Sequence, residues 1–287
     1  TDYSELLKAV TVIAEQAGDR LLNVYDTDAR PADAAALRDA LDRNERVSAD
    51  GTRAALTALL PEARFVGEAE EAAPLPDDGD WWVIDDTEGS VNHIHGLPDW
   101  GVSIALVRAG TPVLAVFRQP VPDLTYTAVV GEGALVGERR LAVSGKQGLD
   151  VAIVGTGQAE ADQPDTYGPI GSSITTLLDA ALLVRASVPS TFPMLQVAGG
   201  NMDAFWQYRP VLPGVAAGSL FVAEAGGRNV PGWLNEGLAQ WLEQAELAVV
   251  IDFVLAHDRA EASLRERVGR EPLFGENNMR MSADLSR

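Results

Sequence analysis

The sequence predicts a mixed α/β (α+β) fold, and three patterns of apolar residues indicate it. Residues 2–25 carry apolar side chains at the spacing of an amphipathic helix. Residues 101–136 contain short apolar runs separated by turn residues, which is typical of an antiparallel meander. From residue 151 onward, strand-like runs alternate with helix-like runs. A chain of 287 residues that is 46% hydrophobic can bury one large core or two joined ones.

The first part of the chain is predicted to form helices before its first strands. Asp2 or Ser4 would cap the first helix, and Pro61 would end the last of them. The predicted helices cover residues 2–25, 36–41 and 52–60. The predicted strands cover residues 64–67 and 81–84, and acidic residues follow each strand directly.

Turn residues divide the remaining chain into further strands and helices. The meander would consist of strands 101–108, 111–118, 124–130 and 133–136. After it we expect strands at 151–156, 182–187, 202–207 and 248–253, and helices at 172–181, 192–198, 215–225 and 259–268. The small polar segment 144–148 separates the two patterns. It predicts an N-terminal α+β domain over residues 1–148, which carries the acidic motif, and a C-terminal α/β domain over residues 149–287.

The composition argues against several classes of function. The 22 basic and 42 acidic residues give a formal charge of −20, which repels nucleic acid and anionic membranes. The absence of cysteine excludes thiolate nucleophiles and cysteine zinc sites, and 3 histidines are too few for a His-rich metal centre. No apolar run reaches the length of a membrane span, and the sequence has no signal-peptide pattern. We expect a cytoplasmic homodimer that acts on a small-molecule substrate and contacts neither nucleic acid nor membrane.

The most informative stretch runs from Trp81 to Gly96 and reads W-W-V-I-D-D-T-E-G-S-V-N-H-I-H-G. A short apolar strand ends in adjacent carboxylates, and a turn of small residues then opens a helix. Carboxylate oxygens hold hard cations such as Mg²⁺. Free N–H groups at the start of a helix receive an anion. The stretch therefore predicts a site for a metal ion and a phosphate group.

This stretch and several others together resemble the inositol monophosphatase family of Mg²⁺-dependent phosphomonoesterases. That family carries G-E-E, then W-[IV]-[IV]-D-P-[IL]-D-G-[TS]-x-N-[FY]-x-H-G, and later W-D-x-A-A-G followed by E-A-G-G. The chain has matching segments in the same order: Gly67-Glu68-Ala69, residues 82–96, Ala216-Ala217-Gly218 and Glu224-Ala225-Gly226-Gly227. The resemblance runs from about Leu6 to Gly227. It implies a layered αβαβα sandwich of the inositol monophosphatase / fructose-1,6-bisphosphatase type, with the site where the two halves meet.

The resemblance also implies roles for the residues that match the motifs. Glu68 and Asp85 match carboxylates that ligate the first Mg²⁺, and the carbonyl of Thr87 matches the backbone ligand beside them. Ser90 matches the hydroxyl that orients the attacking water. The N–H groups of Gly89 and Ser90 match the cradle that holds the phosphate.

Other site positions depart from the family pattern. Glu88 stands where the family has Asp, and its extra methylene displaces a carboxylate that Mg²⁺ needs in near-ideal geometry. Asp86 replaces the family's Pro. Gly214 replaces the Asp of W-D-x-A-A-G, which binds the second metal ion and a substrate hydroxyl. Gln207 stands at the family's substrate-binding acid, and Ser190 lies in its substrate loop.

These departures change the expected chemistry of the pocket. The predicted catalytic groups are Glu68, Asp85, Asp86, Glu88, Ser90 and His93. The predicted substrate contacts are Gly89, Ser90, Ser190, Trp206, Gln207 and Gly214. Without a metal, the four acidic side chains would crowd one pocket, which raises the pKa of at least one carboxyl and creates an acid/base pair. His93 replaces a family aromatic, and packing is the alternative to a catalytic role.

Three functions remain open on the sequence. In the first, the chain is a repurposed enzyme that acts on a small polar or phosphorylated metabolite by carboxylate acid/base chemistry, with no cofactor and without the two-metal mechanism. In the second, it is a phosphomonoesterase that hydrolyses inositol or sugar phosphates with Mg²⁺ bound at Glu68, Asp85 and Thr87. In the third, it is a non-catalytic binding or regulatory protein. The sequence favours them in that order.

Overall fold

The structure, a computed structural model, describes residues 3–49, 51–67, 75, 78–146, 148–158, 163–208 and 210–226. Its larger sheet has 7 strands in the order β1-β2-β3-β4-β5-β6-β7. These are β1 (Arg64–Phe65), β2 (Asp80–Glu88), β3 (Gly101–Arg108), β4 (Thr111–Gln119), β5 (Leu124–Val129), β6 (Gly133–Val136) and β7 (Arg139–Arg140). β1 and β2 are parallel, and all later neighbours are antiparallel. The predicted meander is therefore confirmed.

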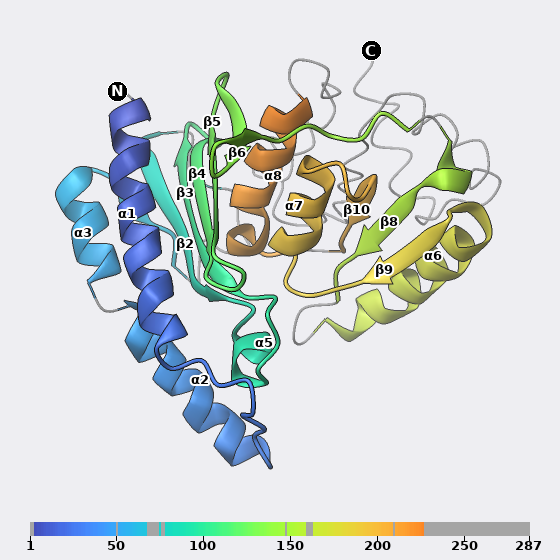
Figure 1. Ribbon diagram of the computed structural model, residues 1–287, viewed down its shortest axis with the longest axis horizontal. Coiled ribbons are helices and arrows are strands. Elements are labelled where there is room, and N and C mark those ends of the chain that lie inside the picture. The colour runs from blue at the N-terminus through green and yellow to red at the C-terminus, as the bar shows by residue number, and fades with distance from the viewer. Residues whose placement is uncertain are drawn as a thin grey trace.

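Three helices precede this sheet and cover one of its faces (Figure 1). They are α1 (Tyr3–Leu22), α2 (Ala34–Ala49) and α3 (Thr52–Leu59). The buried side of α1 carries Leu6, Val10, Ala14, Ala17 and Leu21, whose three- and four-residue spacing was the basis of the helix prediction. α2 is longer than the predicted 36–41, because it is rich in the helix formers Ala and Arg but has few large apolar residues that would reveal a helical pattern.

The second sheet is parallel and follows in the chain. Its 3 strands lie in the order β10-β8-β9, with β8 at Ile153–Thr156, β9 at Leu183–Ala186 and β10 at Ala204–Trp206. The helices around it are η1 (Leu149–Val151), η2 (Pro164–Thr166), α6 (Tyr167–Ala180), α7 (Thr191–Ala198) and α8 (Leu212–Gly226). The predicted elements 248–253 and 259–268 lie outside the described residues.

Helices α7 and α8 lie between the two sheets and pack against both sides of the molecule (Figure 1). The rings of Phe117 and Phe192 lie 5.3 Å apart, and those of Tyr126 and Phe221 lie 6.2 Å apart. These contacts join β4 and β5 to α7 and α8 in one apolar core. The order of layers is thus helices, sheet, helices, sheet and helix, which confirms the αβαβα sandwich. The domain boundary at residue 148 stays a prediction, since that core contains residues from both sides of it.

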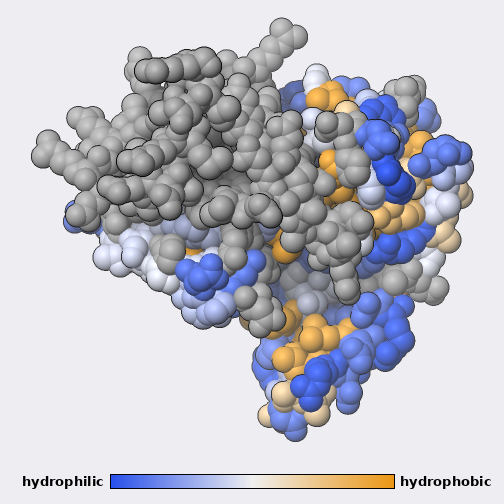
Figure 2. All heavy atoms as spheres, turned by 180° about the vertical axis from the view of Figure 1, so that it is seen from behind, coloured by the Kyte–Doolittle hydropathy of each residue, from blue (hydrophilic) through white to orange (hydrophobic). Residues whose placement is uncertain are grey.

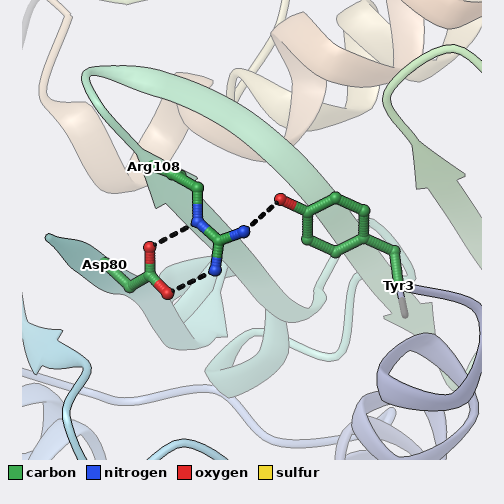
Figure 3. Close-up of polar contacts among 3 residues, drawn as sticks. All are labelled: Tyr3, Asp80 and Arg108. Atoms are coloured by element: carbon green, nitrogen blue, oxygen red, sulfur yellow. Dashed lines mark hydrogen bonds and ion pairs between the residues drawn. The ribbon is translucent and has the colours of Figure 1, made fainter. Parts of the chain in front are cut away.

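Two polar contacts tie distant elements to the larger sheet. Arg108 on β3 donates to both carboxylate oxygens of Asp80 on β2, at 2.7 and 2.6 Å, and to the hydroxyl of Tyr3 at 2.7 Å (Figure 3). Glu224 on α8 accepts the N–H groups of Gly131 and Gly133, each at 2.8 Å. The second contact joins the family segment that begins at Glu224 to the turn between β5 and β6. Arg108 thus fixes the start of α1 against the sheet, and Glu224 fixes α8 against the turn between β5 and β6.

The surface of the described residues mixes hydrophilic and hydrophobic side chains. Figure 2 shows this on the lowest part of the molecule, where hydrophobic residues lie among hydrophilic ones. Large apolar side chains are also exposed near the end of α6, at Leu178, Leu182 and Leu183. None of the described helices has the length and hydropathy needed to cross a membrane.

Candidate active site

The site begins where β2 ends and turns into the short helix α5 (Ser90–Ile94). The strand was predicted to end at Ile84, but it continues to Glu88, because backbone pairing with β3 holds the polar residues in place. The register shifts between Asp85 and Glu88, which is a β-bulge. A bulge redirects the side chains at the end of a strand, so neighbouring carboxylates here face different partners.

Gly89 makes the turn that follows the strand. Its φ is +81°, and a Cβ atom at this position would lie 2.6 Å from the carbonyl oxygen of Asp99. Only glycine meets both requirements at low cost. The turn places Ser90 at the first position of α5, with its side chain half-buried. The structure therefore holds the predicted phosphate-binding pair next to the acidic end of β2.

Asp85 and Thr87 are joined by a hydrogen bond, and their role as metal ligands stays a prediction. The Thr87 N–H donates a 3.0 Å hydrogen bond to Oδ1 of Asp85, and Asp85 is half-buried. This bond fixes the carboxylate beside the backbone of Thr87. Glu68, the other predicted ligand, lies outside the described residues.

Glu88 reaches across to the second half of the molecule. The residue is 1% exposed, and its Oε1 accepts the N–H of Thr191 at 3.2 Å. Thr191 begins α7, where the helix dipole favours a carboxylate. The Thr191 hydroxyl in turn donates to the carbonyl of Gly214 at 3.2 Å. Glu88 and Gly214 thus both contact Thr191 at the start of α7.

Gly214 leaves space at this junction. A Cβ atom built on it would meet only Cγ2 of Val211, at 3.9 Å, which is ordinary van der Waals contact. Beside it, the Ser190 hydroxyl donates to Oε1 of Gln207, and both residues are buried. Ser190, Gln207 and Gly214 therefore surround the start of α7. Their predicted contact with substrate stays a prediction.

Trp206 and Gln207 have different surroundings although they are neighbours. Successive side chains of a strand point to opposite faces, and β10 ends at Trp206. Trp206 is 1% exposed and packs with Val154, Leu177 and Tyr208 in the core of the smaller sheet. This placement gives Trp206 a packing role, and a substrate contact by its indole would require the core to open.

Asp86 is half-buried, and the charged groups that act on it come from α1, α2 and α3. Burial raises the pKa of its carboxyl, while the charges of Arg53 and Arg20 act in the opposite direction. Its Oδ1 is buried without a hydrogen-bond partner among the described residues. Glu88 and Asp86 thus interact with different elements, because Glu88 binds the start of α7. Glu68 lies outside the described residues, so the expected crowding of four acids stays a prediction.

His93 is held inside the protein by both ring nitrogens. Its Nδ1 lies 2.8 Å from the Asn44 amide nitrogen, and its Nε2 lies 3.1 Å from the Leu21 carbonyl oxygen. The ring is 2% exposed and meets the edge of Trp100 at a centroid distance of 4.5 Å. Burial lowers the pKa of His93, so the neutral imidazole accepts from Asn44 and donates to Leu21. This arrangement supports the packing alternative, because no ring nitrogen points to the site.

The sequence reasoning gave no role to Asn92, which joins the two halves of the site. Its amide nitrogen donates to the carbonyl oxygens of Asp99, at 2.7 Å, and Val188, at 2.9 Å. Val188 lies just before Ser190, so this contact positions the substrate loop against α5. The signal was available, since Asn is a fixed letter of the central family motif.

The donors at the end of β2 suit a hard cation. They are carboxylate and carbonyl oxygens, and Mg²⁺ is held by one or two carboxylates together with water and substrate phosphate. Among the residues that the structure describes, no three acidic or histidine side chains converge on one point. A single ion at Asp85 and Thr87 stays a prediction, and Glu68, the further candidate ligand, lies outside the described residues. The described residues do not form a complete protein cage.

Comparison with known proteins identifies the relatives of this chain. The inositol monophosphatase family model matches residues 1–239. The inositol-1-monophosphatase of Rhizobium meliloti is 30% identical over 218 residues, which are 76% of this chain and 78% of that protein. Nus factor SuhB of Pseudomonas aeruginosa is 34% identical over 195 residues, which are 66% of this chain and 71% of that protein.

Solved structures show the same fold. The inositol monophosphatase from Anabaena superposes with a TM-score of 0.65 at 24% identity, over 85% of this chain and 97% of that one. SuhB of Mycobacterium tuberculosis gives a TM-score of 0.64 at 22% identity, over 85% of this chain and 97% of that one. The sequence motifs, the layered fold and the family match agree. The chain belongs to the inositol monophosphatase family.

Proposed function

We propose that the protein is a Mg²⁺-dependent phosphomonoesterase that hydrolyses a small phosphate ester, such as an inositol or sugar phosphate. The observation that carries the proposal is the arrangement at the end of β2. There Asp85 is bonded to the backbone of Thr87, and Gly89 turns the chain into Ser90. Membership in the inositol monophosphatase family supports the same reading. It favours the phosphatase over the repurposed enzyme that the sequence placed first.

The protein's own residues have distinct tasks in this reaction. Asp85, Glu68 and the carbonyl of Thr87 would hold Mg²⁺, which supplies Lewis acidity and lowers the pKa of a bound water. The N–H groups of Gly89 and Ser90 would bind the phosphate oxygens of the substrate. The Ser90 hydroxyl would orient the attacking water. The carboxylate of Glu88 fixes the start of α7 beside them through the Thr191 N–H.

A second tightly bound ion is not part of this proposal. Glu88 is engaged with α7, and Gly214 offers no carboxylate. In two-metal hydrolysis one ion activates the water and the other stabilises the leaving oxygen. We therefore propose one strong Mg²⁺ site and a modest rate.

The repurposed enzyme and the non-catalytic protein remain competing proposals. The repurposed reading is favoured by the same Glu88–Thr191 contact, which commits one of the two Glu88 carboxylate oxygens to the start of α7. The regulatory reading is motivated by a relative named Nus factor SuhB. In each case we propose a cytoplasmic homodimer that binds a small molecule, and sedimentation of the full chain would measure the oligomeric state.

Phosphate release from a panel of inositol and sugar phosphates tests the proposal. The native chain should release phosphate in the presence of Mg²⁺, and this release should stop when EDTA is added. Asp85→Asn should lower the rate by about a hundredfold or more, since it removes a charged ligand. Asp99→Asn is a matched control on the neighbouring loop and should leave the rate close to native, because only the backbone carbonyl of Asp99 makes a described contact with the site. Release that persists in EDTA would support the repurposed enzyme, and no release with any ester would support the binding protein.

A further inference from the structure

A hollow of about 380 Å³ lies between α1 and α2 and is lined by arginines. Its lining residues are Arg20, Asn23, Arg43, Arg46 and Val47, and we call it the arginine hollow. Figure 1 shows the C-terminal end of α1 beside α2, and these two elements carry most of the lining residues. None of these lining residues is acidic, although acidic residues outnumber basic ones by 42 to 22 in the whole chain. The hollow therefore concentrates positive charge in a strongly acidic protein.

Arg20 is fixed in the wall of the hollow. Its Nε donates to the carbonyl of Val47 at 3.2 Å, and its Nη2 donates to the hydroxyl of Thr52 at 2.9 Å. These bonds join α1 to the end of α2 and to the start of α3. They hold the guanidinium in one place, so a ligand would meet a preorganised charge.

Arg43 and Arg46 differ from Arg20 in the contacts of their guanidinium groups. Neither side chain makes an ion pair or a hydrogen bond with any residue that the structure describes. They lie three residues apart on α2, so their side chains share one face and their like charges repel each other. An anion between them would relieve this repulsion. Both guanidinium groups have donors available for it.

Helix dipoles explain only part of this cluster. Arg20 and Arg46 lie in the last turns of α1 and α2, where a cation offsets the negative end of the helix. Arg43 lies one turn earlier, where this effect has fallen off. Its side chain nevertheless lines the same hollow. The helix dipole therefore does not account for the third guanidinium group, that of Arg43.

We propose that the arginine hollow binds a phosphate group, either inorganic phosphate or the phosphate of a small ester. Guanidinium forks match phosphate oxygens and bind them through paired hydrogen bonds. Asn23 adds an amide donor from α1. The hollow is distinct from the candidate active site in its lining, because its residues come from the ends of α1 and α2 and none of them belongs to the end of β2 or the start of α7. The proposal does not depend on phosphatase activity.

Calorimetric titration of the full chain with inorganic phosphate tests this site. The buffer contains EDTA at constant ionic strength, so that metal-dependent binding at the active site is absent. The double variant Arg43→Gln/Arg46→Gln should bind phosphate about tenfold more weakly than the native chain, or worse, because charge-assisted pairs are lost. The matched control is Arg38→Gln/Arg185→Gln, which removes the same charge from exposed arginines outside the hollow. It should stay within about twofold of native, as expected for distant surface charges.

The outcomes are distinct. If phosphate binding weakens equally in both double variants, the effect is general electrostatics and the proposal is overturned. Unchanged binding in Arg43→Gln/Arg46→Gln, or no phosphate binding by the native chain, would also overturn it. Thermal unfolding in chloride checks that both variants fold, and Arg43→Gln alone replaces the double variant if it does not. A second titration with glycerol phosphate distinguishes the sources. If glycerol phosphate binds more tightly than inorganic phosphate, the ligand of the hollow is a phosphate ester. If the two bind equally, the hollow recognises the phosphate group alone.

Discussion

At the scale of single residues, the site depends on a glycine that no other residue can replace. Gly89 combines a positive φ with a close approach to the Asp99 carbonyl. Gly131 has a similar φ of +79°, but a Cβ atom there would meet nothing within 4 Å. A side chain at Gly131 would meet only the cost of the left-handed backbone, whereas a side chain at Gly89 would also overlap the Asp99 carbonyl.

Substitution by alanine at these glycines should have unequal effects. Gly131→Ala should cost about 1–2 kcal/mol of unfolding free energy, the usual penalty of a left-handed alanine. Gly89→Ala should cost about 1–3 kcal/mol more, because the added methyl group overpacks the turn. Urea unfolding measures both values. Equal losses in the two variants would show that the Asp99 carbonyl yields without cost.

Substitutions at Glu88 and Gly214 test whether a missing carboxylate limits phosphate release. There is room for a side chain at position 214, and Glu88 lies at the same junction. Gly214→Asp combined with Glu88→Asp should raise phosphate release by about tenfold or more, since it restores carboxylates for a second ion. The control variant combines Gly214→Asn with Glu88→Asp, because asparagine has the shape of aspartate without its charge. If the aspartate and asparagine variants have the same rate, a missing carboxylate is not what limits the native protein.

At the scale of elements, His93 fastens α5 to α1 and α2. Burial lowers the pKa of His93 below its usual 6.5, so the unfolded chain binds a proton more readily than the folded one. This contribution to stability is complete above about pH 6.5 and falls as the pH drops below that value. Urea unfolding should therefore show that the free energy of unfolding of the native protein falls between pH 7 and pH 5. The fall should be smaller in His93→Gln. His95→Gln is the control and should keep the native pH dependence.

The contact of Arg108 with Asp80 and Tyr3 anchors the start of α1 to the β2–β3 hairpin (Figure 3). The hydrogen bonds from Arg108 hold the pKa of Asp80 below its usual value. A lowered carboxyl pKa stabilises the fold above the unfolded value near 3.8 and is lost as the pH falls through the folded value. Asp80→Asn should cost about 1–3 kcal/mol at pH 7, and less in strong acid. Asp78→Asn, in the exposed pair with Arg64, should change stability little at either pH.

The sequence predicted elements where side-chain pattern alone decides the structure. The buried stripe of α1, from Leu6 to Leu21, and the meander of β3 to β6 are such cases. The pattern did not reveal the full length of α2 or the extension of β2 to Glu88. In β2 the deciding factor is pairing with β3, which the side chains of Asp85 to Glu88 do not show.

At the scale of the whole molecule, the site is a junction between elements far apart in the sequence. The N–H of Thr191 binds Glu88 across 103 positions, and Asn92 binds Val188 across 96. The motifs predicted which residues meet at this junction. They did not predict that Glu88 would bind the start of α7 or that arginines of α1 and α3 would act on Asp86, because both depend on how the elements pack. Trp206 shows the same limit, since strand alternation separates it from Gln207.

The most direct test of the central claim is the initial rate of phosphate release by the native chain as a function of Mg²⁺ concentration. The proposed single site at Asp85 and Thr87 predicts a rate that is negligible in EDTA and rises with Mg²⁺ along a simple one-site saturation curve. An inositol or sugar phosphate that the panel identifies as a substrate is used at a saturating level. A rate that does not depend on Mg²⁺, or the absence of phosphate release at saturating metal, would contradict the account.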